Sequence, residues 1–347
     1  MPPMEIVRAQ NVEDARLWEE FVETQAAASN YHRWNWKSVL ERSFGWPTFY
    51  LMAIEAGRVK GILPLAWQKS WIFRGCVASL PVLSAGGVVA DSPTAAAALL
   101  EEAKRVTTQV GAKFLELRYR GPSGDHLPVR DDKLTVVRPL GPDSEKMWAE
   151  LGTKIRTKIR KATNAGMTAE FGGMEFLGEF YALFCENMRD LGTPVYGRPL
   201  FEEILKAFPQ HTHICIVRLQ GEVIATSFLT GFRDAIEAKW SASKSQYLSL
   251  KPNMFLYWNL FCFAGQKGYK VFDFGRSTPG SGTHVFKMQW GSESIPLNWA
   301  YWLPAGEALP QVNTRNPRFE AAIRIWQKLP VAVTRTIGPS LVRHLPS

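Results

Sequence analysis

Hydrophobic and polar positions alternate along the chain with spacings that predict a regular succession of helices and strands. In the first part, apolar side chains recur every three or four residues in two segments, which is typical of amphipathic helices. Ser92-Pro93 favours a helix start at the second segment, and two apolar runs joined by Gly57-Arg58 predict a β-hairpin. The predicted elements are helices at 12–24 and 92–110, hairpin strands at 50–56 and 59–67, and a further strand at 114–119.

The second part of the chain repeats this order. Two helices are followed by apolar runs on either side of Gln220-Gly221-Glu222, which again indicates a hairpin. The predicted elements are helices at 176–191, 199–208 and 253–267, and strands at 214–219, 223–230, 235–242 and 269–274. Both parts read helix, hairpin, further strand, helix, strand, which is the order of an acyltransferase fold of the GNAT type, present twice. We expect an α/β (α+β) protein with two such domains in tandem, each a mixed, mostly antiparallel sheet flanked by helices.

Three segments follow from this pattern. We expect an N-terminal domain at 1–145, a C-terminal domain with the active site at 146–305, and a tail at 306–347. The C-terminal domain opens with a basic linker helix at 152–166. At helical spacing its lysines and arginines form two stripes on either side of an apolar seam: Lys154, Lys158 and Lys161, then Arg156 and Arg160, with Ile155, Ile159 and Ala162 between them. The stripes favour a phosphate clamp; the alternative is a solvated helix with one buried edge.

The tail is basic and amphipathic. From Asn313 to Ser347 it carries six Lys and Arg residues and one acid, Glu320. Its apolar stripe at helical spacing consists of Phe319, Ile323, Trp326 and Leu329, and we expect Pro330, Pro339 and Pro346 to interrupt the helix. A basic amphipathic helix can lie on an anionic membrane surface; the alternative is packing against its own domain.

Composition and charge narrow the range of protein classes to which the chain can belong. The 347 residues are enough for two domains with cores, and the net charge of +9 favours anionic partners such as RNA, phosphorylated precursors, coenzyme A or acidic lipid. The four cysteines are scattered, without CxxC or His–Cys ligand spacing, which argues for cytosolic thiols and against a disulfide frame or a metal site. No signal peptide and no apolar run of about 18 residues is present. We expect a cytoplasmic protein, with peripheral contact at the inner membrane left open.

The segment 268–291, GYKVFDFGRSTPGSGTHVFKMQWG, carries the most chemistry. A β-type run from Tyr269 to Phe274 contains Asp273 and leads through Gly275 to Arg276. A stretch rich in Gly, Ser, Thr and Pro follows, and we expect regular structure to resume at 286–291. A buried strand that ends in an acid and opens into a Gly-rich, cationic loop is typical of α/β enzyme sites. The alternative is an ordinary joint in which Asp273 caps a turn.

These residues resemble a known family. DFGRS, GSGT and F-K-x-x-W-G resemble the C-terminal half of the FemAB-like transferases, the peptidoglycan bridge-forming aminoacyltransferases, in the branch associated with exosortase/PEP-CTERM loci. Three further segments look like the same family in the same order: KIRTKIRKATNAGM at 154–167, LGTPVYGRPLFEEIL at 191–205 and KPNMFLYW at 251–258. The resemblance is specific from about Lys154 to Trp302. It implies tandem GNAT domains in a compact form, without the long helical arm of several Gram-positive members.

The resemblance also implies a reaction. An amine attacks an activated carbonyl, with aminoacyl-tRNA as donor and an amine of a cell-envelope or exopolysaccharide-related precursor as acceptor, and without a metal or cofactor. The family lysine at the donor's reactive end matches Lys287, where a cation can stabilise an oxyanion, and the aromatic residue beside it matches Phe286. We expect Asp273 to hold the incoming ammonium and accept a proton. Arg276 is expected to grip a phosphate or carboxylate, or alternatively to pair with Asp273.

The remaining candidates are expected to bind substrate. Arg189, Tyr196 and Arg198 match the family's acceptor-side segment, or alternatively support the turn around Pro194. Glu237, Lys239 and Ser241 alternate with Ile236, Ala238 and Trp240, so each set is expected to share one strand face, and one face lines the site. The other candidates are Trp240, Tyr247, Asn253, Tyr257, Arg156 and Arg160. An N-cap role is the alternative for Asn253, and a place in the core is the alternative for Tyr257.

Two other functions stay open. An acyl-CoA- or acyl-carrier-protein-dependent N-acyltransferase is the first, although Gly280-Ser281-Gly282 only loosely matches the Gly-rich pyrophosphate loop of CoA-dependent GNAT enzymes. A non-catalytic module that binds an anionic ligand is the second. The sequence has no G-x-S-x-G nucleophile elbow and no cysteine at a family catalytic position, so we expect no acyl-enzyme intermediate.

Overall fold

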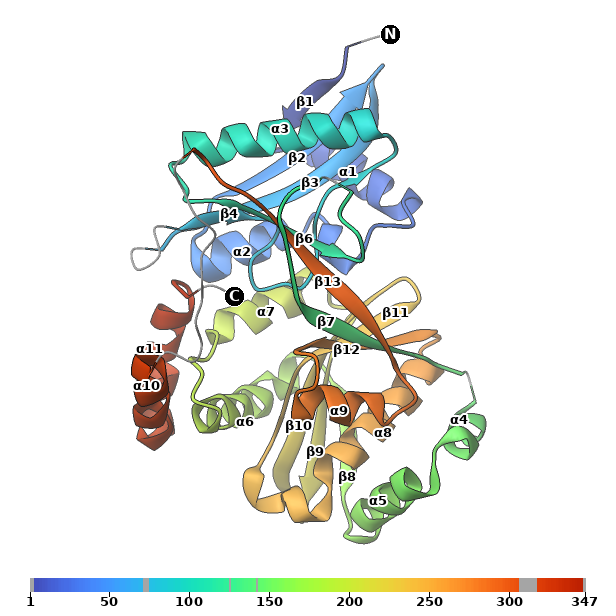
Figure 1. Cartoon of the computed structure of the whole chain (residues 1–347). Helices are drawn as coiled ribbons and strands as arrows, with labels where there is room; N and C mark the ends of the chain where they lie inside the picture. The colour runs from blue at the N-terminus through green and yellow to red at the C-terminus, as the bar shows by residue number, and fades with distance from the viewer. Residues whose placement is uncertain (1–2, 71–74, 125, 142, 306–316, 346–347) are drawn as a thin grey trace. The chain divides into compact units, whose positions relative to one another are not determined.

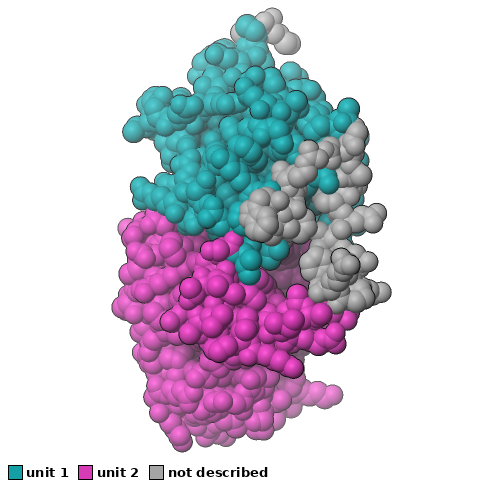
Figure 2. Space-filling model, turned by 90° about the vertical axis from the view of Figure 1, so that its left-hand side faces the viewer, with its two compact units in different colours: residues 1–132, 296–312, 341–347 teal, residues 133–295, 313–340 magenta. Residues whose placement is uncertain are grey.

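The computed structural model of the protein describes residues 3–70, 75–124, 126–141, 143–305 and 317–345 (Figure 1). It divides into two compact units (Figure 2), which interleave in the sequence. Unit 1 comprises residues 1–132, 296–312 and 341–347, and unit 2 comprises residues 133–295 and 313–340. The units are thus not the contiguous segments 1–145, 146–305 and 306–347 of the sequence analysis. The stretch at 306–316 and Pro346, both assigned to the tail, lie outside the described residues.

Unit 1 is built on a sheet of strand order β1-β2-β3-β4-β6-β13, in which β5 also pairs with β3. The β4–β6 pair is parallel and the other pairs are antiparallel. The strands are β1 (Glu5–Arg8), β2 (Thr48–Glu55), β3 (Arg58–Gln68), β4 (Cys76–Ala78), β5 (Val89–Ala90), β6 (Leu115–Arg120) and β13 (Glu293–Trp302). The helices are α1 (Val12–Thr24), α2 (Trp36–Phe44) and α3 (Pro93–Gln109), with a 3-10 turn at Asn30–His32.

Alternation along β2 places helices on both faces of this sheet (Figure 1). Leu51 belongs to the core that contains Leu99 of α3, whereas the neighbouring Tyr50 packs against Trp18 of α1 with ring centroids 4.7 Å apart. Successive side chains of a strand point to opposite faces, so the two helices cover opposite sides. The predicted start of α3 is confirmed, because the Ser92 side chain accepts a hydrogen bond from the Ala95 amide at 3.1 Å.

Unit 2 is built on a sheet of strand order β7-β12-β11-β10-β9-β8, in which only the β11–β12 pair is parallel. The strands are β7 (Val129–Pro139), β8 (Thr168–Gly172), β9 (Thr212–Leu219), β10 (Glu222–Phe232), β11 (Ala235–Ser243) and β12 (Val271–Ser277). The helices are α4 (Ser144–Glu150), α5 (Thr153–Asn164), α6 (Leu177–Asp190), α7 (Arg198–Ala207), α8 (Pro252–Gln266), α9 (Gly282–Met288), α10 (Pro317–Lys328) and α11 (Val331–Val342), with 3-10 turns at Met174–Phe176 and Ser245–Leu250.

A β-bulge in β11 corrects the expectation that Glu237, Lys239 and Ser241 share one face. Phe228 pairs with Trp240 and Leu229 with Ala238, so Lys239 is the extra residue of the bulge. The alternation of side chains between the two faces of the sheet therefore reverses at Lys239. Ala238 joins the core that contains α8, whereas Trp240 packs on Phe201 of α7 with ring centroids 5.2 Å apart. Helices α6 and α7 thus cover one face of the sheet, and α8 covers the other.

The basic helix α5 (Thr153–Asn164) forms close to the expected 152–166. Ile155, Ile159 and Ala162 are buried in the core around α8, which confirms the apolar seam. The cations lie on both sides of this seam. The side chains of Lys154, Arg160 and Lys161 are exposed, and those of Arg156 and Lys158 are half-buried.

The described part of the tail forms two helices, α10 and α11, which belong to unit 2 up to residue 340, whereas the residues from 341 onward belong to unit 1. The Arg189 guanidinium donates to the Leu329 carbonyl at 3.1 Å, and Gln327 donates to the Asp190 carbonyl at 2.9 Å. Trp326 is buried, whereas the side chain of Phe319 lies outside the described residues. The expected helix break at Pro339 is wrong, because α11 continues through this residue. Next to this proline, Gly338 is buried and packs against Val195.

A buried ion pair in unit 1 offers a test of this fold. Arg118 is 1% exposed and pairs with Glu116 at 2.6 Å, and Glu116 also accepts from the Tyr301 hydroxyl at 2.7 Å. We expect Arg118→Met to lower the free energy of unfolding by about 3–5 kcal/mol, because Glu116 would remain buried without its cation. Urea unfolding measures this loss. Arg105→Met, which breaks an exposed pair with Glu102, should cost less than about 1 kcal/mol, and equal losses in the two variants would contradict the assignment.

Candidate functional site

A second β-bulge, in β12, shapes the site. Asp273 pairs with Val137 and Arg276 with Thr135, so β12 advances three residues while β7 advances two. Gly275 lies in this bulge with φ +72°, a conformation that residues with a Cβ rarely adopt. The bulge removes the local main chain from the regular ladder. Main-chain carbonyls therefore become available to side chains at this point of β12.

Asp273 is 8% exposed and anchors the bulge. Its Oδ1 accepts a hydrogen bond from the Thr135 hydroxyl at 2.5 Å and another from the Gly275 amide at 2.8 Å. Two donors on one oxygen hold the carboxylate in a fixed position. Asp273 thus has the structural role that the alternative interpretation gave it, because its carboxylate accepts from a main-chain amide of the bulge.

Lys287 is 7% exposed, which excludes the ordinary surface lysine. It lies in the last turn of α9, and its Nζ donates to the carbonyls of Gly275 at 2.8 Å and Arg276 at 3.0 Å. An ammonium has three N–H donors, so the two carbonyls leave one for another acceptor. Helix α9 begins at Gly282, which corrects the expectation that regular structure resumes at 286–291.

Burial lowers the pKa of Lys287 from 10.5 to about 8. The carboxylates of Asp273 and Glu237 oppose this shift by stabilising the ammonium, and the cations of Lys239 and Arg276 reinforce it. Arg276 itself is exposed. The three residues predicted to be catalytic, Asp273, Arg276 and Lys287, therefore lie close together around one bulge.

Glu237 belongs to this group, although the sequence analysis did not place it among the catalytic candidates. It pairs with Asp273 across the parallel strands β11 and β12, so both carboxylates lie on the same face of the sheet. A Cβ added to Gly275 would lie 3.4 Å from Glu237 Oε1. The sequence signal was the acid within the alternating strand 235–242, but only the pairing with β12 identifies its neighbour.

Aromatic side chains support the site from within the core. The Tyr257 ring lies 5.3 Å from both Phe274 and Phe286, measured between centroids. Tyr257 is buried, as its alternative assignment to the core predicted, and burial raises the pKa of its hydroxyl, while a hydrogen bond with Ser241 acts in the opposite direction. Phe286 is half-buried at the edge of this core. The two rings connect α8 and α9 to the bulged strand.

Three other candidates are not brought into this group. Trp240 is buried beneath α6 and α7, so the face that carries it is core. The Tyr247 hydroxyl donates to Glu222 at 2.5 Å, at the opposite end of β10 from Thr230, which pairs with Glu237. The N-cap alternative for Asn253 is wrong, because Lys251 holds the cap position and Pro252 the first helical position of α8.

The acceptor-side candidates lie where the tail packs. Arg189 also pairs with Asp190 at 2.6 Å, and the Tyr196 carbonyl accepts from the Tyr181 hydroxyl at 3.1 Å. Arg198 is exposed at the first position of α7. The turn around Pro194 is thus held by α6 and the tail, as its structural alternative predicted. Arg156 and Arg160 lie on α5, and the Arg160 guanidinium is 5.5 Å from the centroid of Trp148.

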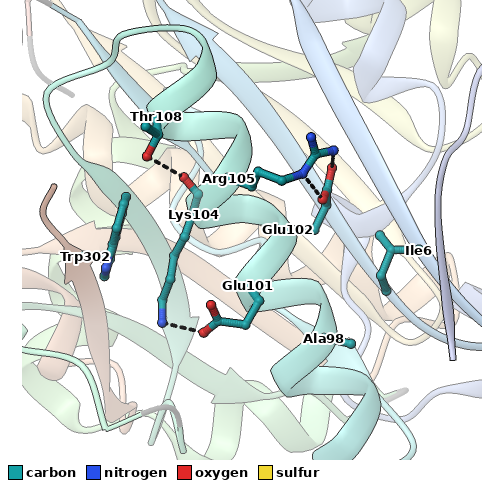
Figure 3. A pocket seen from close by; sticks show the side chains of 8 residues that line it. All are labelled: Ile6, Ala98, Glu101, Glu102, Lys104, Arg105, Thr108 and Trp302. Atoms are coloured by element: carbon teal, nitrogen blue, oxygen red, sulfur yellow. Dashed lines mark hydrogen bonds and ion pairs between the residues drawn. The ribbon is translucent and has the colours of Figure 1, made fainter.

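Two hollows lie elsewhere on the described surface. The larger, of about 640 Å³, lies on α3 of unit 1, where the cations pair with neighbouring acids: Lys104 with Glu101 and Arg105 with Glu102 (Figure 3). Its charges are satisfied locally, so size alone does not make it a site. The second hollow, of about 520 Å³, is lined by Ser144, Glu145, Trp148 and Trp258 of unit 2. We assign the candidate active site to the bulge, because the buried lysine and paired carboxylates lie there.

Comparisons with known proteins agree with this architecture. Residues 151–288 match the family described as acetyltransferase (GNAT) domain. The crystal structure of FemX is similar with a TM-score of 0.64 and 15% identity, over 85% of this chain and 97% of that one. L-PGS from Bacillus licheniformis is similar with a TM-score of 0.55 and 15% identity, over 96% of this chain and 99% of that one. A search of curated protein sequences finds no match.

The fold class is settled by a third structure. A tandem GNAT protein from the clavulanic acid biosynthesis pathway is similar with a TM-score of 0.55 and 13% identity, over 89% of this chain and 100% of that one. The expected fold is therefore confirmed: the chain is a tandem of GNAT-like domains with mixed, mostly antiparallel sheets. In the described part of the chain, no helix has the length and apolar character needed to cross a bilayer.

The shifted pKa of Lys287 makes stability depend on pH. Because its pKa is about 8 in the folded chain and 10.5 ordinarily, the unfolded chain binds more protons between these values, and stability rises with pH over this window. Relative to Lys287→Met, the wild-type chain should gain about 2 kcal/mol in the free energy of unfolding between pH 7 and 9.5. Urea titrations of both proteins at several pH values measure the difference. Parallel pH dependence would show that the lysine does not titrate in this range.

Proposed function

We propose that this chain is a FemAB-like transferase that moves an aminoacyl group from an activated donor to an amine. The donor is aminoacyl-tRNA, and the acceptor is an amine of a cell-envelope or exopolysaccharide-related precursor, in the exosortase/PEP-CTERM-associated branch. The observation that carries the proposal is the buried Lys287 ammonium beside the paired acids Asp273 and Glu237. The GNAT match and the similarity in fold to FemX and L-PGS support it.

The residues supply each part of an aminoacyl transfer. A neutral amine attacks the ester carbonyl of the donor; the N–C bond forms, the C–O bond breaks, and the amine proton ends on the leaving hydroxyl oxygen. Lys287, which is 7% exposed, donates its remaining N–H to the oxygen that becomes negative. Asp273 accepts two hydrogen bonds on Oδ1, and Glu237 lies beside it on the same face of the sheet, so this pair of carboxylates supplies the proton acceptor.

The Gly-rich loop before α9 disfavours coenzyme A as the donor. The Ser281 side chain accepts from the His284 amide at 3.3 Å, and the Gly280 amide donates to His284 Nδ1 at 3.0 Å. Amides that already donate within their own helix turn are poorly placed to hold a pyrophosphate. An acyl-CoA- or acyl-carrier-protein-dependent N-acyltransferase remains the second candidate, favoured by the acetyltransferase description of the matching domain.

Donor assays test the proposal. Purified protein should consume aminoacyl-tRNA only when an amine acceptor is present, and Lys287→Met should lower kcat about 10²–10³-fold, as expected for loss of one oxyanion donor. In the wild-type chain the rate should fall above about pH 8, because the ammonium is lost there. Lys287→Arg, which stays charged, should retain activity at higher pH.

The other results of this assay are equally informative. Turnover with acyl-CoA or acyl carrier protein but not with charged tRNA would promote the second candidate. Tight binding of an anionic ligand without turnover of any donor would instead favour a non-catalytic module. A rate that rises above pH 8 in the wild-type chain but not in Lys287→Arg would assign Lys287 a role as a neutral amine.

Peripheral membrane contact through the tail is part of the proposal. Ile325 of α10 is 64% exposed, and Ile323, Val333 and Ile337 are also exposed, among the cations Arg324, Lys328 and Arg335. Apolar and cationic side chains together favour an anionic lipid surface. We expect the protein to sediment with vesicles rich in phosphatidylglycerol, and Ile325→Ser combined with Arg324→Ser to reduce this binding several-fold. Undiminished sedimentation of the double variant would exclude the tail as the contact.

A further inference from the structure

Helix α5 carries a concentration of unneutralised positive charge. Its twelve residues include five cations and no acid. In the described ranges, no carboxylate oxygen lies within 4 Å of any of them; their recorded side-chain partners are neutral, Thr153 for Arg156 and Gln289 for Lys158. On α3, by contrast, the cations around the hollow of unit 1 pair with acids of the same helix (Figure 3). The charge of α5 is therefore available to an anionic ligand.

Two tryptophans lie beside this helix and line the hollow of about 520 Å³. Trp148 of α4 and Trp258 of α8 have ring centroids 5.0 Å apart and planes inclined by 62°. Both rings are partly buried on the core of unit 2. The Arg160 guanidinium lies 5.5 Å from the centroid of Trp148, so the arginine stripe of α5 lies next to one of the two rings that line the hollow.

The two indole rings beside a row of cations favour a ligand that combines a flat aromatic ring with separate negative charges. An indole face offers stacking to an aromatic ring, and successive cations along a helix match successive phosphates. Glu145 also lines the hollow and disfavours a phosphate there. The ring therefore belongs in the hollow and the phosphates along α5, which is the pattern of a polynucleotide strand.

We infer that α5 and the Trp148–Trp258 hollow form a binding surface for single-stranded RNA, with one base in the hollow and the following phosphates along the helix. The inference deepens the proposed function and rests on it in one respect: the bound RNA is the tRNA part of the aminoacyl-tRNA donor. It assigns unit 2 a second region of contact with the donor, built from residues other than those of the bulge.

Binding of a labelled, uncharged RNA oligonucleotide of about ten nucleotides tests the surface, with fluorescence anisotropy measured at several salt concentrations. Trp148→Ala should weaken binding roughly tenfold, and Trp148→Phe should restore most of it, because base stacking needs an aromatic ring. Arg160→Glu with Lys161→Glu should lower the slope of log affinity against log salt by about 1.4, as expected for two lost phosphate contacts on a single strand.

A matched control separates the surface from net charge. Arg42→Glu with Arg58→Glu changes the formal charge equally at exposed positions of unit 1 and should leave the slope unchanged. Thermal unfolding shows whether each variant is folded. Equal weakening by both double variants, or displacement of the RNA by coenzyme A at similar concentration, would overturn the inference.

Turnover distinguishes this inference from the proposed function. If the α5 variants raise the KM for charged tRNA while kcat is kept, both stand. If the RNA binds as described but no donor is consumed, the surface stands and the transferase does not. If charged tRNA is consumed with unchanged KM by Trp148→Ala and by the Arg160→Glu, Lys161→Glu double variant, the transferase stands and the surface is wrong.

Discussion

The hydrogen bonds from the buried Lys287 ammonium to the carbonyls of Gly275 and Arg276 are the interaction on which the site depends. A buried cation needs acceptors around it, and regular β-strands direct their carbonyls to neighbouring strands. The bulge at Gly275 frees two carbonyls and places them toward α9. The same bulge is held by Asp273, so the position of the cation and that of the acid are set by one feature of the main chain.

A second bulge, at Lys239, decides what surrounds this feature. Before the bulge, Glu237 lies on the same face as Asp273, and its charge raises the pKa of Lys287. After the bulge, Ser241 contacts Tyr257, and Trp240 enters the core beneath α6 and α7. The extra residue thus reverses the alternation of side chains along β11. Residues with odd numbers face one side of the sheet before Lys239 and the other side after it. Two neighbouring strands thus each depart from the regular ladder just beyond the Glu237–Asp273 pair.

The electrostatics of unit 2 separate into two regions. Around the bulge, opposite charges are close and partly buried, so burial and pairing compete and the pKa of Lys287 falls to about 8. Along α5, like charges lie at the surface without acids beside them. The first arrangement suits chemistry at neutral pH, whereas the second suits attraction of a polyanion.

Helix positions and the proximity of the candidate site residues could be predicted from the sequence, because they depend on local spacing. Helix α1 at Val12–Thr24, the Ser92 cap of α3 and the buried seam of α5 follow from 3.6-residue periodicity and capping chemistry. Asp273, Arg276 and Lys287 lie within fifteen residues of one another, on a strand, its loop and the next short helix. Their proximity is thus largely a consequence of chain connectivity.

Tertiary structure decided whatever depends on pairing between distant segments. The bulges cannot be counted from one strand, because an extra residue is defined only against its partner, and the place of Glu237 beside Asp273 follows only from the pairing of β11 with β12. The return of β13 to pair with β6 makes unit 1 discontinuous. Helix α11 continues through Pro339, and the neighbouring Gly338 packs on Val195. In each case long-range contacts outweigh a local preference, and local preferences are all that a single sequence displays.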